Sequence, residues 1–501
     1  MMVAPVANGA AIAAHSSEGD LVKAEEAKQQ ANKDFKEKHY AKAVAGYTTA
    51  LQYNPNSEIL YSNRAFAHIR LENFGSAVAD ATKAVELNPR FAKGLYRRGD
   101  AYYALGKFKL ALKDLKAAVR LTSKDPDLRR KLADCEKEVK RLRFEEALAV
   151  PEEIEVPVAQ TIDLASMLVE ESYTGPRMSG DNEKGYQLTL DFAKAMLEHF
   201  REQKSIHRRF AFQIILQARE ILKALPSLVD VPVAQGGHIT VCGDVHGQFY
   251  DLLNIFKLNG LPAEDSPYLF NGDFVDRGSF SLEVILTLLA FKVLYPQHMH
   301  LARGNHESKG MNKIYGFEGE VKHKYNAIMA DLFRETFCWL PLAHVLDGRV
   351  LVVHGGLFSQ DEVTLDDLRR IDRYREPPEE GLMCELLWSD PQASEGRSPS
   401  KRGVGVAFGP DVTRRFLAAN KLDLLVRSHE VKDEGYEVDH DGYCVTVFSA
   451  PNYCDQMGNK GAFIRFNGGD MTPQFTTYTA VPHPDVKPMA YASAMGGIWG
   501  F

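Results

Sequence analysis

Several short apolar runs in this sequence end in residues that could bind a metal ion. The relevant motifs are GDVHG, GDFVDRG, GNHE and VVHGG, and a fifth apolar run precedes a further histidine. The candidate ligands are Asp244, His246, Asp273, Asn305, His354 and His429. Because side chains at the carboxyl ends of strands gather at one edge of an α/β sheet, we expect these ligands to converge. Nitrogen and oxygen ligands without cysteine favour manganese, iron or zinc.

This ligand set favours two divalent ions rather than one. A carboxylate can bridge ions about 3.5–4 Å apart, a spacing that clamps both oxygens of an in-line displacement at phosphorus. Asp273 is the expected bridge. Water held between the ions would be largely deprotonated at neutral pH and would attack phosphorus directly. The expected chemistry is phosphoester hydrolysis without a covalent phospho-enzyme.

The same motifs hold residues suited to the remaining chemistry. His306 follows Asn305 directly and cannot easily face the same ion, so it is available as the general acid for the leaving alkoxide. Asp276 could orient that imidazole as in a His–Asp pair. Arg277 carries a planar fork that suits a phosphate dianion. Each residue alone would more often be structural, and their clustering in two motifs favours the functional interpretation.

The ligands lie in a region whose pattern predicts an α/β domain. Helical periodicity follows Tyr186 and then gives way to short β-rich runs. These runs are 238–242, 268–270, 299–301, 350–353, 424–426 and 443–448. Helical segments such as 282–294 lie between several of them, which favours sheets at the centre of the domain.

The N-terminal region repeats with a period of 34 residues. Small residues recur in phase, as at Ala31, Ala65 and Gly99, and the units span about 24–57, 58–91 and 92–125. The pattern resembles the tetratricopeptide repeat, whose two helices pack closely at the small positions. Three copies in phase argue against an unrelated helical bundle.

Composition indicates the other boundaries. Residues 1–20 are expected to be a disordered leader, and 21–145 to hold the repeats with a capping helix from about Lys124 to Phe144. The acidic, proline-containing residues 146–180 are interpreted as a linker. Residues 181–480 are the expected catalytic domain, and 481–501 a C-terminal tail.

The net charge of -7 is unevenly distributed along the chain. Residues 21–145 contain 26 basic and 16 acidic residues, a net charge of +10, whereas the remainder contains 34 and 51, a net charge of -17. The basic module should attract acidic partners, including the rest of its own chain. We expect no nucleic acid, because no recognised motif accompanies the charge, and no membrane span. Six scattered cysteines suit reduced thiols in the cytoplasm or nucleus.

From about His238 to Tyr478 the motifs resemble the phosphoprotein phosphatase family of metal-dependent serine/threonine phosphatases. Beyond the motifs above, LLWSDP, RGVG, RSHE and SAPNYCDQMGN carry the resemblance. It implies a multidomain protein, an all-α solenoid plus an α/β metallophosphatase domain with a central β-sandwich of mixed sheets flanked by helices. Asp244, His246 and Asp273 would then hold one metal, and Asp273, Asn305, His354 and His429 the other. The resemblance also implies phosphate binding by Arg277, Asn305, Arg402 and Tyr453, with His306 as acid and Asp276 as its orienter.

The repeats carry a second set of residues with a family resemblance. Lys28, Asn32, Asn63, Lys93 and Arg97 fall on the first helices, which line the groove of such a solenoid. They look like the carboxylate clamp that captures the C-terminal MEEVD-type peptide of the ninety-kilodalton heat-shock chaperone. The alternative is a solvated basic face. The resemblance further implies that the repeats cover the catalytic groove and inhibit it, with a contact from Glu72.

Two other functions remain open at this point. A metallophosphoesterase acting on nucleotides or diesters would share the metal motifs, although not SAPNYCDQMGN or chaperone-type repeats. A catalytically weak scaffold that recruits chaperone clients would keep the repeats and lose the metal, whereas the phosphatase that the motifs resemble implies phosphoprotein substrates.

Overall fold

The computed structural model describes residues 17–148 and 156–492. The chain divides into two compact units, residues 1–140 and 141–501, which are described separately below. Residues 1–16 of the predicted leader, 1–20, lie outside the described part, whereas residues 18–20 belong to the first helix. Within that part, none of the helices combines the length and the apolarity needed to cross a membrane.

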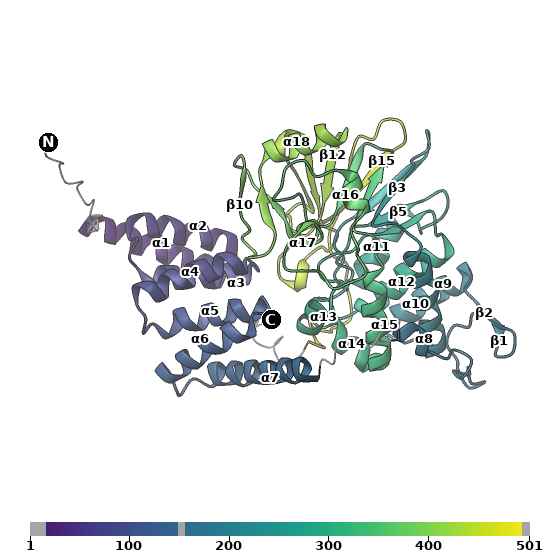
Figure 1. The fold of residues 1–501 in the computed structure, drawn as a ribbon, viewed down its shortest axis with the longest axis horizontal. Helices are drawn as coiled ribbons and strands as arrows, with labels where there is room; N and C mark the ends of the chain where they lie inside the picture. Colours follow the sequence, from purple (N-terminus) through teal and green to yellow (C-terminus); the bar gives the residue numbers. More distant parts are fainter. Residues whose placement is uncertain (1–16, 149–155, 493–501) are drawn as a thin grey trace, which may run out of the picture. The chain divides into compact units, whose positions relative to one another are not determined.

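Three helix pairs form the first unit (Figure 1). They are α1 Glu18–Lys36 with α2 Tyr40–Tyr53, α3 Glu58–Arg70 with α4 Phe74–Leu87, and α5 Ala92–Ala104 with α6 Phe108–Leu121. The in-phase small residues are buried where helices meet, and a Cβ added at Gly99 would lie 3.0 Å from Leu115. A capping box between Ser17 and Asp20 begins α1. The tetratricopeptide pattern is therefore confirmed.

Two half-buried ion pairs recur at the repeat period. Arg64 pairs with Asp80 at 2.7 Å, and Arg98, 34 positions further on, pairs with Asp114 at 2.7 Å. The equivalent positions of the first repeat hold Gln30 and Gly46.

The helix after the repeats, α7 Pro126–Leu148, runs longer than the predicted 124–144. Its buried Lys131 forms an ion pair with Asp100 of α5 and lies 4.9 Å from the Tyr103 ring centroid. A buried pair of this kind ties the helix to the third repeat.

The prediction of a linker over 146–180 is wrong for the greater part of its length. From residue 156 the chain packs on the second unit, through the short helix α8 Val158–Thr161 and the buried side chains of Val169 and Met178. The backbone N–H of Ala159 donates to Glu335. The apolar residues of this acidic segment cover a hydrophobic surface, and their burial outweighs the proline and charge content.

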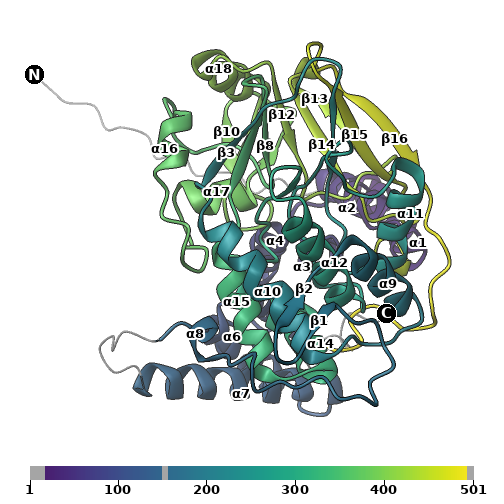
Figure 2. The ribbon, with the colours of Figure 1, turned by 90° about the vertical axis from the view of Figure 1, so that its right-hand side faces the viewer.

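Two sheets packed face to face form the centre of the second unit (Figures 1 and 2). The larger sheet has the order β13-β14-β12-β8-β7-β3 and the smaller β16-β15-β4-β5-β6. The larger consists of β3 Leu228–Val231, β7 Ala343–Leu346, β8 Val350–Val353, β12 Leu424–Arg427, β13 Tyr436–Asp439 and β14 Cys444–Val447. The smaller consists of β4 His238–Cys242, β5 Tyr268–Phe270, β6 Met299–Leu301, β15 Gly461–Asn467 and β16 Gln474–Tyr478. Buried Val, Leu and Ile side chains of both sheets meet between them.

Helices cover both outer faces of the sandwich. Helices α11 Phe249–Asn259 and α12 Ser281–Leu294 pack on the smaller sheet (Figure 2). Helices α9 Leu190–Arg201 and α10 Arg208–Lys223 pack on α12, and α15 Ala327–Cys338 packs on α10, within the same apolar core. Helices α17 Leu382–Trp388 and α18 Pro410–Asn420 pack on the larger. The remaining elements are α13 Lys309–Tyr315, α14 Phe317–Lys324, α16 Leu365–Arg369, β1 Ser179–Asp181, β2 Gly185–Gln187, β9 Asp390–Pro391, β10 Arg397–Pro399 and β11 Val406–Phe408. The predicted fold class, with mixed sheets flanked by helices, is confirmed.

Strand direction explains where the ligand motifs meet. Strands β4, β5 and β6 are parallel neighbours, and so are β8, β12 and β14. A parallel bridge between Asp244 and Phe448 joins the ends of the two sheets. The loops after these strands therefore open at the same end of the sandwich.

Candidate metal and phosphate site

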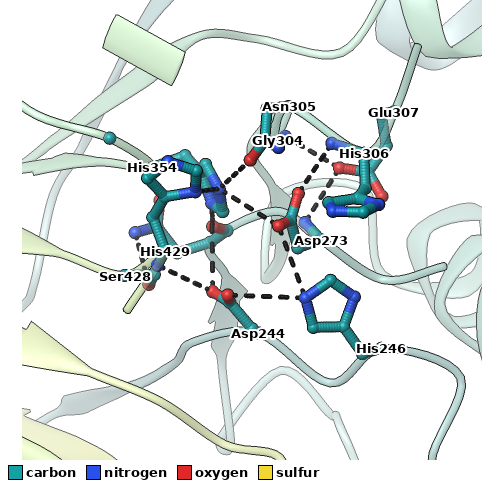
Figure 3. Close-up of polar contacts among 12 residues, drawn as sticks. Asp244, His246, Asp273, Gly304, Asn305, His306, Glu307, His354, Ser428 and His429 are labelled. Carbon is teal, nitrogen blue, oxygen red and sulfur yellow. Dashed lines mark hydrogen bonds and ion pairs between the residues drawn. The ribbon is translucent and has the colours of Figure 1, made fainter. Parts of the chain in front are cut away.

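The six predicted ligands converge at that end of the sandwich (Figure 3). Each follows a strand: Asp244 and His246 follow β4, Asp273 β5, Asn305 β6, His354 β8 and His429 β12. All six side chains are buried. Three of them have a positive φ, 40° at His246, 49° at Asp273 and 71° at His429. Non-glycine residues rarely adopt this conformation, which points to a site that the surrounding structure holds in place.

Asp273 lies between two groups of ligand atoms. Its Oδ2 is 3.5 Å from Nε2 of His246 and 3.3 Å from Nε2 of His354. Ligand atoms within 4.8 Å of one another form two sets that share Asp273: one contains His246 and His306, the other His354 and His429. Asp244 falls in neither set, although its Oδ2 is 3.7 Å from Nε2 of His246.

Hydrogen bonds leave the histidine lone pairs directed at this centre. Nδ1 of His246 is 3.0 Å from the Val275 carbonyl, and Nδ1 of His354 is 2.8 Å from the Asn271 carbonyl. A carbonyl only accepts, so both Nδ1 atoms carry the proton and both Nε2 atoms present a lone pair.

Two acceptors then face each other inside the site. Nε2 of His354 is 2.8 Å from Oδ1 of Asn305, and neither atom has a proton to share when Nδ1 of His354 is protonated. A cation between them resolves the contact. The residues present therefore fit a metal ion.

Burial makes the charge of this site costly without a cation. Burial raises the pKa of Asp244 to about 7, and the charge of Asp273 adds to that shift. Burial raises the pKa of Asp273 to about 8, and the charge of Asp276 adds to that shift. Burial also lowers the pKa of His246 and His429 well below the usual range, so both rings are neutral. Neutral imidazoles and desolvated carboxylates are the forms that bind divalent metals.

Glu307 is a functional residue that the sequence interpretation missed. Its buried carboxylate accepts backbone N–H groups from Asp273 and Gly304 through Oε2, and from Phe274 through Oε1, each at 2.8 Å. These bonds fix the loop that carries Asp273. The glutamate stands in the GNHE motif, but its role depends on how that turn folds.

His306 and Asp276 form the predicted pair. Nδ1 of His306 is 2.8 Å from Oδ2 of Asp276, and the same carboxylate accepts from Phe317 N at 2.9 Å and Asn312 Nδ2 at 3.1 Å. The His306 backbone N–H donates to Oδ1 of Asp273 at 2.9 Å. The ring lies 4.8 Å from that of His246, beside the first ligand group. Nε2 of His306 therefore faces the metal side of the site.

The two arginines implied by the resemblance are held in different ways. Arg402 donates to both oxygens of buried Asp390, at 2.7 and 3.2 Å, and to the His429 carbonyl at 2.8 Å. Arg277, which is 1% exposed, lies with its guanidinium carbon 3.7 Å from the Tyr315 ring centroid. Both belong to the loops of the metal site.

Tyr453 also lies beside the ligands. Its ring centroid is 5.1 Å from that of His246, and its backbone N–H donates to Asn459 at 2.9 Å. The residues before and after it have positive φ, 42° at Asn452 and 52° at Cys454. This tight turn presents the tyrosine ring to the site.

The predicted clamp residues occupy the first helices of the repeats, on α1, α3 and α5. Asn32 accepts from Tyr47 at 2.7 Å and from Asn63 at 3.5 Å, so these two asparagines meet across adjacent repeats. Lys28 pairs with Glu25 of its own helix at 2.6 Å.

Lys93 and Arg97 lie one helical turn apart on α5. Lys93 is exposed, and the Arg97 guanidinium stacks 3.5 Å from the Phe66 ring centroid. Glu72 lies in the turn between α3 and α4, with a φ of 61°.

Comparison with known families agrees with both units. The calcineurin-like phosphoesterase family matches residues 237–433. A phosphatase 5 TPR repeat region matches residues 132–230, and two tetratricopeptide families match 60–91 and 99–134. These matches define the class: a phosphoesterase of the calcineurin-like type that carries tetratricopeptide repeats.

Relatives identify the family within that class. A serine/threonine-protein phosphatase 5 of Arabidopsis thaliana is 61% identical over 95% of this chain and 97% of its own length. The Homo sapiens protein of the same name is 55% identical over 96% of this chain and 95% of its own. The chain belongs to the serine/threonine-protein phosphatase 5 family.

A solved structure also matches. It is a Saccharomyces cerevisiae protein serine/threonine phosphatase described as similar to human phosphatase PP5, 45% identical, with a TM-score of 0.59. It covers 60% of this chain and 100% of its own. The expected enzyme class, a protein serine/threonine phosphatase, is confirmed, and the nucleotide or diester alternative is set aside.

Proposed function

We propose that this enzyme hydrolyses phosphoserine and phosphothreonine in one displacement at a centre of two divalent ions. The carrying observation is Asp273, whose Oδ2 lies 3.5 and 3.3 Å from imidazole nitrogens of two separate ligand groups. Asp244 and His246 would complete one ion's ligands, and Asn305, His354 and His429 the other's. When bound, the ions supply the charge that activates water and neutralises phosphate.

His306 would protonate the leaving seryl or threonyl oxygen. Its Nδ1 proton is held by Asp276, which leaves Nε2 as the atom that carries and donates the catalytic proton. Asp276 keeps the ring in this orientation and stabilises its protonated form.

Four residues would bind the phosphate group. Arg277 and Arg402 present guanidinium forks, and Asn305 offers its amide N–H₂ because Oδ1 faces His354. Tyr453, beside His246, lies where its hydroxyl can contact a substrate oxygen.

Turnover of a phosphoserine peptide with manganese tests this proposal. We expect hydrolysis with manganese, none after chelation, and little turnover of a cyclic nucleotide. The catalytically weak scaffold gives a different result: no metal retained after purification and no turnover with any divalent ion. That result would overturn the proposed chemistry.

For the repeat unit we propose binding of the acidic MEEVD-type C-terminus of the ninety-kilodalton heat-shock chaperone. Support comes from the contact between Asn32 and Asn63 and from the stacked Arg97 on the next first helix. A peptide with several carboxylates suits a module with a net charge of +10.

We further propose that the repeats inhibit the catalytic site until a peptide binds, with Glu72 contributing a contact. The opposite net charges of the two regions, +10 and -17, support such docking. The expected compartments are cytoplasm and nucleus. Adding MEEVD peptide to the full chain should raise phosphopeptide turnover; an unchanged rate at saturating peptide would contradict the inhibition.

A further inference from the structure

The C-terminal segment returns to the loop that carries Arg277. The hydroxyl of Ser279 donates to the Lys487 carbonyl at 2.6 Å and accepts the Ala490 N–H at 3.1 Å. The Met489 N–H donates to the Arg277 carbonyl at 2.8 Å. Residues 487–490 are therefore bound along the GDFVDRG loop, more than 200 residues away in sequence.

Met489 also contacts the side chain of Arg277. The Nη1 group of Arg277 donates to Sδ of Met489 at 4.0 Å, and Met489 is itself 6% exposed. The guanidinium also stacks on Tyr315, whose carbonyl accepts the Arg277 backbone N–H at 3.2 Å. The ring contact and the sulfur contact together restrict the orientation of the guanidinium.

The backbone gives a reason for this support. Arg277 has a φ of 69° and follows Asp276 with a φ of 70°, an unfavourable conformation for two successive non-glycine residues. Such a conformation persists only where surrounding contacts determine it. The bonds from Tyr315 and Met489 to the Arg277 backbone are contacts of this kind.

Sulfur is also a suitable anchor electrostatically. Arg402 is oriented by the carboxylate of Asp390, which offsets part of its charge. The thioether of Met489 orients Arg277 without adding a negative charge at that contact.

From these contacts we infer that residues 487–490 belong to the phosphate site, with Met489 as the positioning residue for Arg277. The inference rests on the proposed role of Arg277 in binding phosphate. It assigns catalytic importance to a segment that the sequence shows only as a tail after the last strand.

Inhibition by inorganic phosphate tests the inference, because phosphate probes the anion site without the rest of a substrate. In the full chain, we expect Met489→Ala to raise the phosphate inhibition constant and the KM for a phosphoserine peptide about fivefold, with kcat changed less than about twofold. Met489→Leu keeps the side-chain volume but removes the acceptor sulfur, so both constants should stay raised. Met178→Ala, at another buried methionine of the same unit, should leave both constants unchanged.

A double-mutant cycle with Arg277→Ala separates positioning from general loosening. If Met489 acts through Arg277, Met489→Ala has no further effect on phosphate inhibition once Arg277 is alanine. Ser279→Ala removes two bonds to the segment, so it should reproduce part of the effect even where Met489→Ala folds poorly. An additive effect in the cycle, or normal phosphate inhibition in both Met489→Ala and Ser279→Ala, overturns the inference. If Arg277→Ala itself leaves phosphate inhibition unchanged, the proposed role of Arg277 fails instead.

Discussion

The repeat unit and the catalytic unit place their functional residues in opposite ways. In the repeats, the clamp residues stand on regular helices and are at least partly exposed, and Asn63 and Arg97 lie 34 positions apart. In the catalytic unit, the ligands are buried on loops after strands, and three have positive φ. A repeat residue can therefore be exchanged with little effect on its neighbours, whereas a residue of the metal site supports several others.

The largest expected effect lies in the catalytic unit. His306→Ala should lower kcat for a phosphoserine peptide about 10³-fold, because it removes the proton donor for the leaving group. MEEVD-peptide affinity, measured by calorimetry on the same protein, should be unchanged. Turnover within tenfold of the unmodified enzyme would contradict the acid assignment, and a changed peptide affinity would contradict the separation of the two units.

Glu307→Gln tests whether the hydrogen bonds that hold the ligand loops contribute to metal affinity as the ligands themselves do. An amide cannot accept all three backbone N–H groups now bound by Glu307, so metal affinity should fall about 10- to 100-fold. Manganese titration of turnover would measure this change.

Glu320→Gln is the matched control for that titration. Glu320 is also buried and accepts two backbone N–H groups, those of Ser281 and Leu282, away from the ligands. The substitution Glu320→Gln should lower the stability of the unit and leave the manganese requirement for turnover unchanged. Equal shifts in both variants would show a general loss of structure.

Two adjacent arginines test the repeat unit. Arg97→Ala should weaken MEEVD-peptide binding about tenfold, because it removes a charge-assisted contact in the proposed groove. Arg98→Ala breaks the pair with Asp114 and should lower the thermal stability of the repeats, with a smaller effect on affinity. Unchanged affinity in Arg97→Ala would remove the clamp assignment.

Low pH should destabilise the catalytic unit through a buried histidine that lies between its two sheets. His300 and His344 face each other with ring centroids 5.7 Å apart, and burial lowers the pKa of His300 to about 3 from 6.5. Below pH 6.5 the unfolded chain takes up a proton that the folded chain does not, so stability falls as the pH falls toward 3.

The expected change in unfolding free energy is small and specific to His300. Between pH 6.5 and 5.5, His300→Phe should reduce the loss of unfolding free energy by about 1 kcal/mol. Urea unfolding followed by tryptophan fluorescence reports on this unit, because Trp339 and Trp388 lie within it and the sequence of residues 1–140 contains no tryptophan. An identical pH dependence in both proteins would show that His300 does not titrate on unfolding.

The difference between the two units also explains what the sequence could predict. Repeat periodicity and strand-end motifs together indicate the fold class. The strand-end motifs also predict that the six ligands, His306 and Asp276 lie in one region. Each strand-end motif spans only a few residues, and the repeat recurs at a fixed spacing, so both can be recognised in the sequence alone. The contacts of Glu307 depend on a turn that the motif does not describe.

Longer-range contacts had no sequence signal of this kind. Met489 meets Arg277 only because the last segment returns past the sandwich, and Asp390 joins Arg402 through the fold of three strands. The error over 146–180 is different. Apolar residues such as Val169 and Met178 lie in that segment, and their burial outweighs its acidic, proline-containing composition.

The unequal ion pairs of the repeats have a consequence for local unfolding. The second and third repeats each contain an internal Arg–Asp pair, and Lys131 with Asp100 closes the third against α7. The first repeat, with Gln30 and Gly46 at those positions, should exchange its amide hydrogens fastest. Lys28 and Asn32 lie on that repeat. A peptide bound to them would therefore stabilise the folded state of the least stable repeat. Part of the binding free energy would then offset the cost of folding that repeat, and the measured affinity would be lower by that amount.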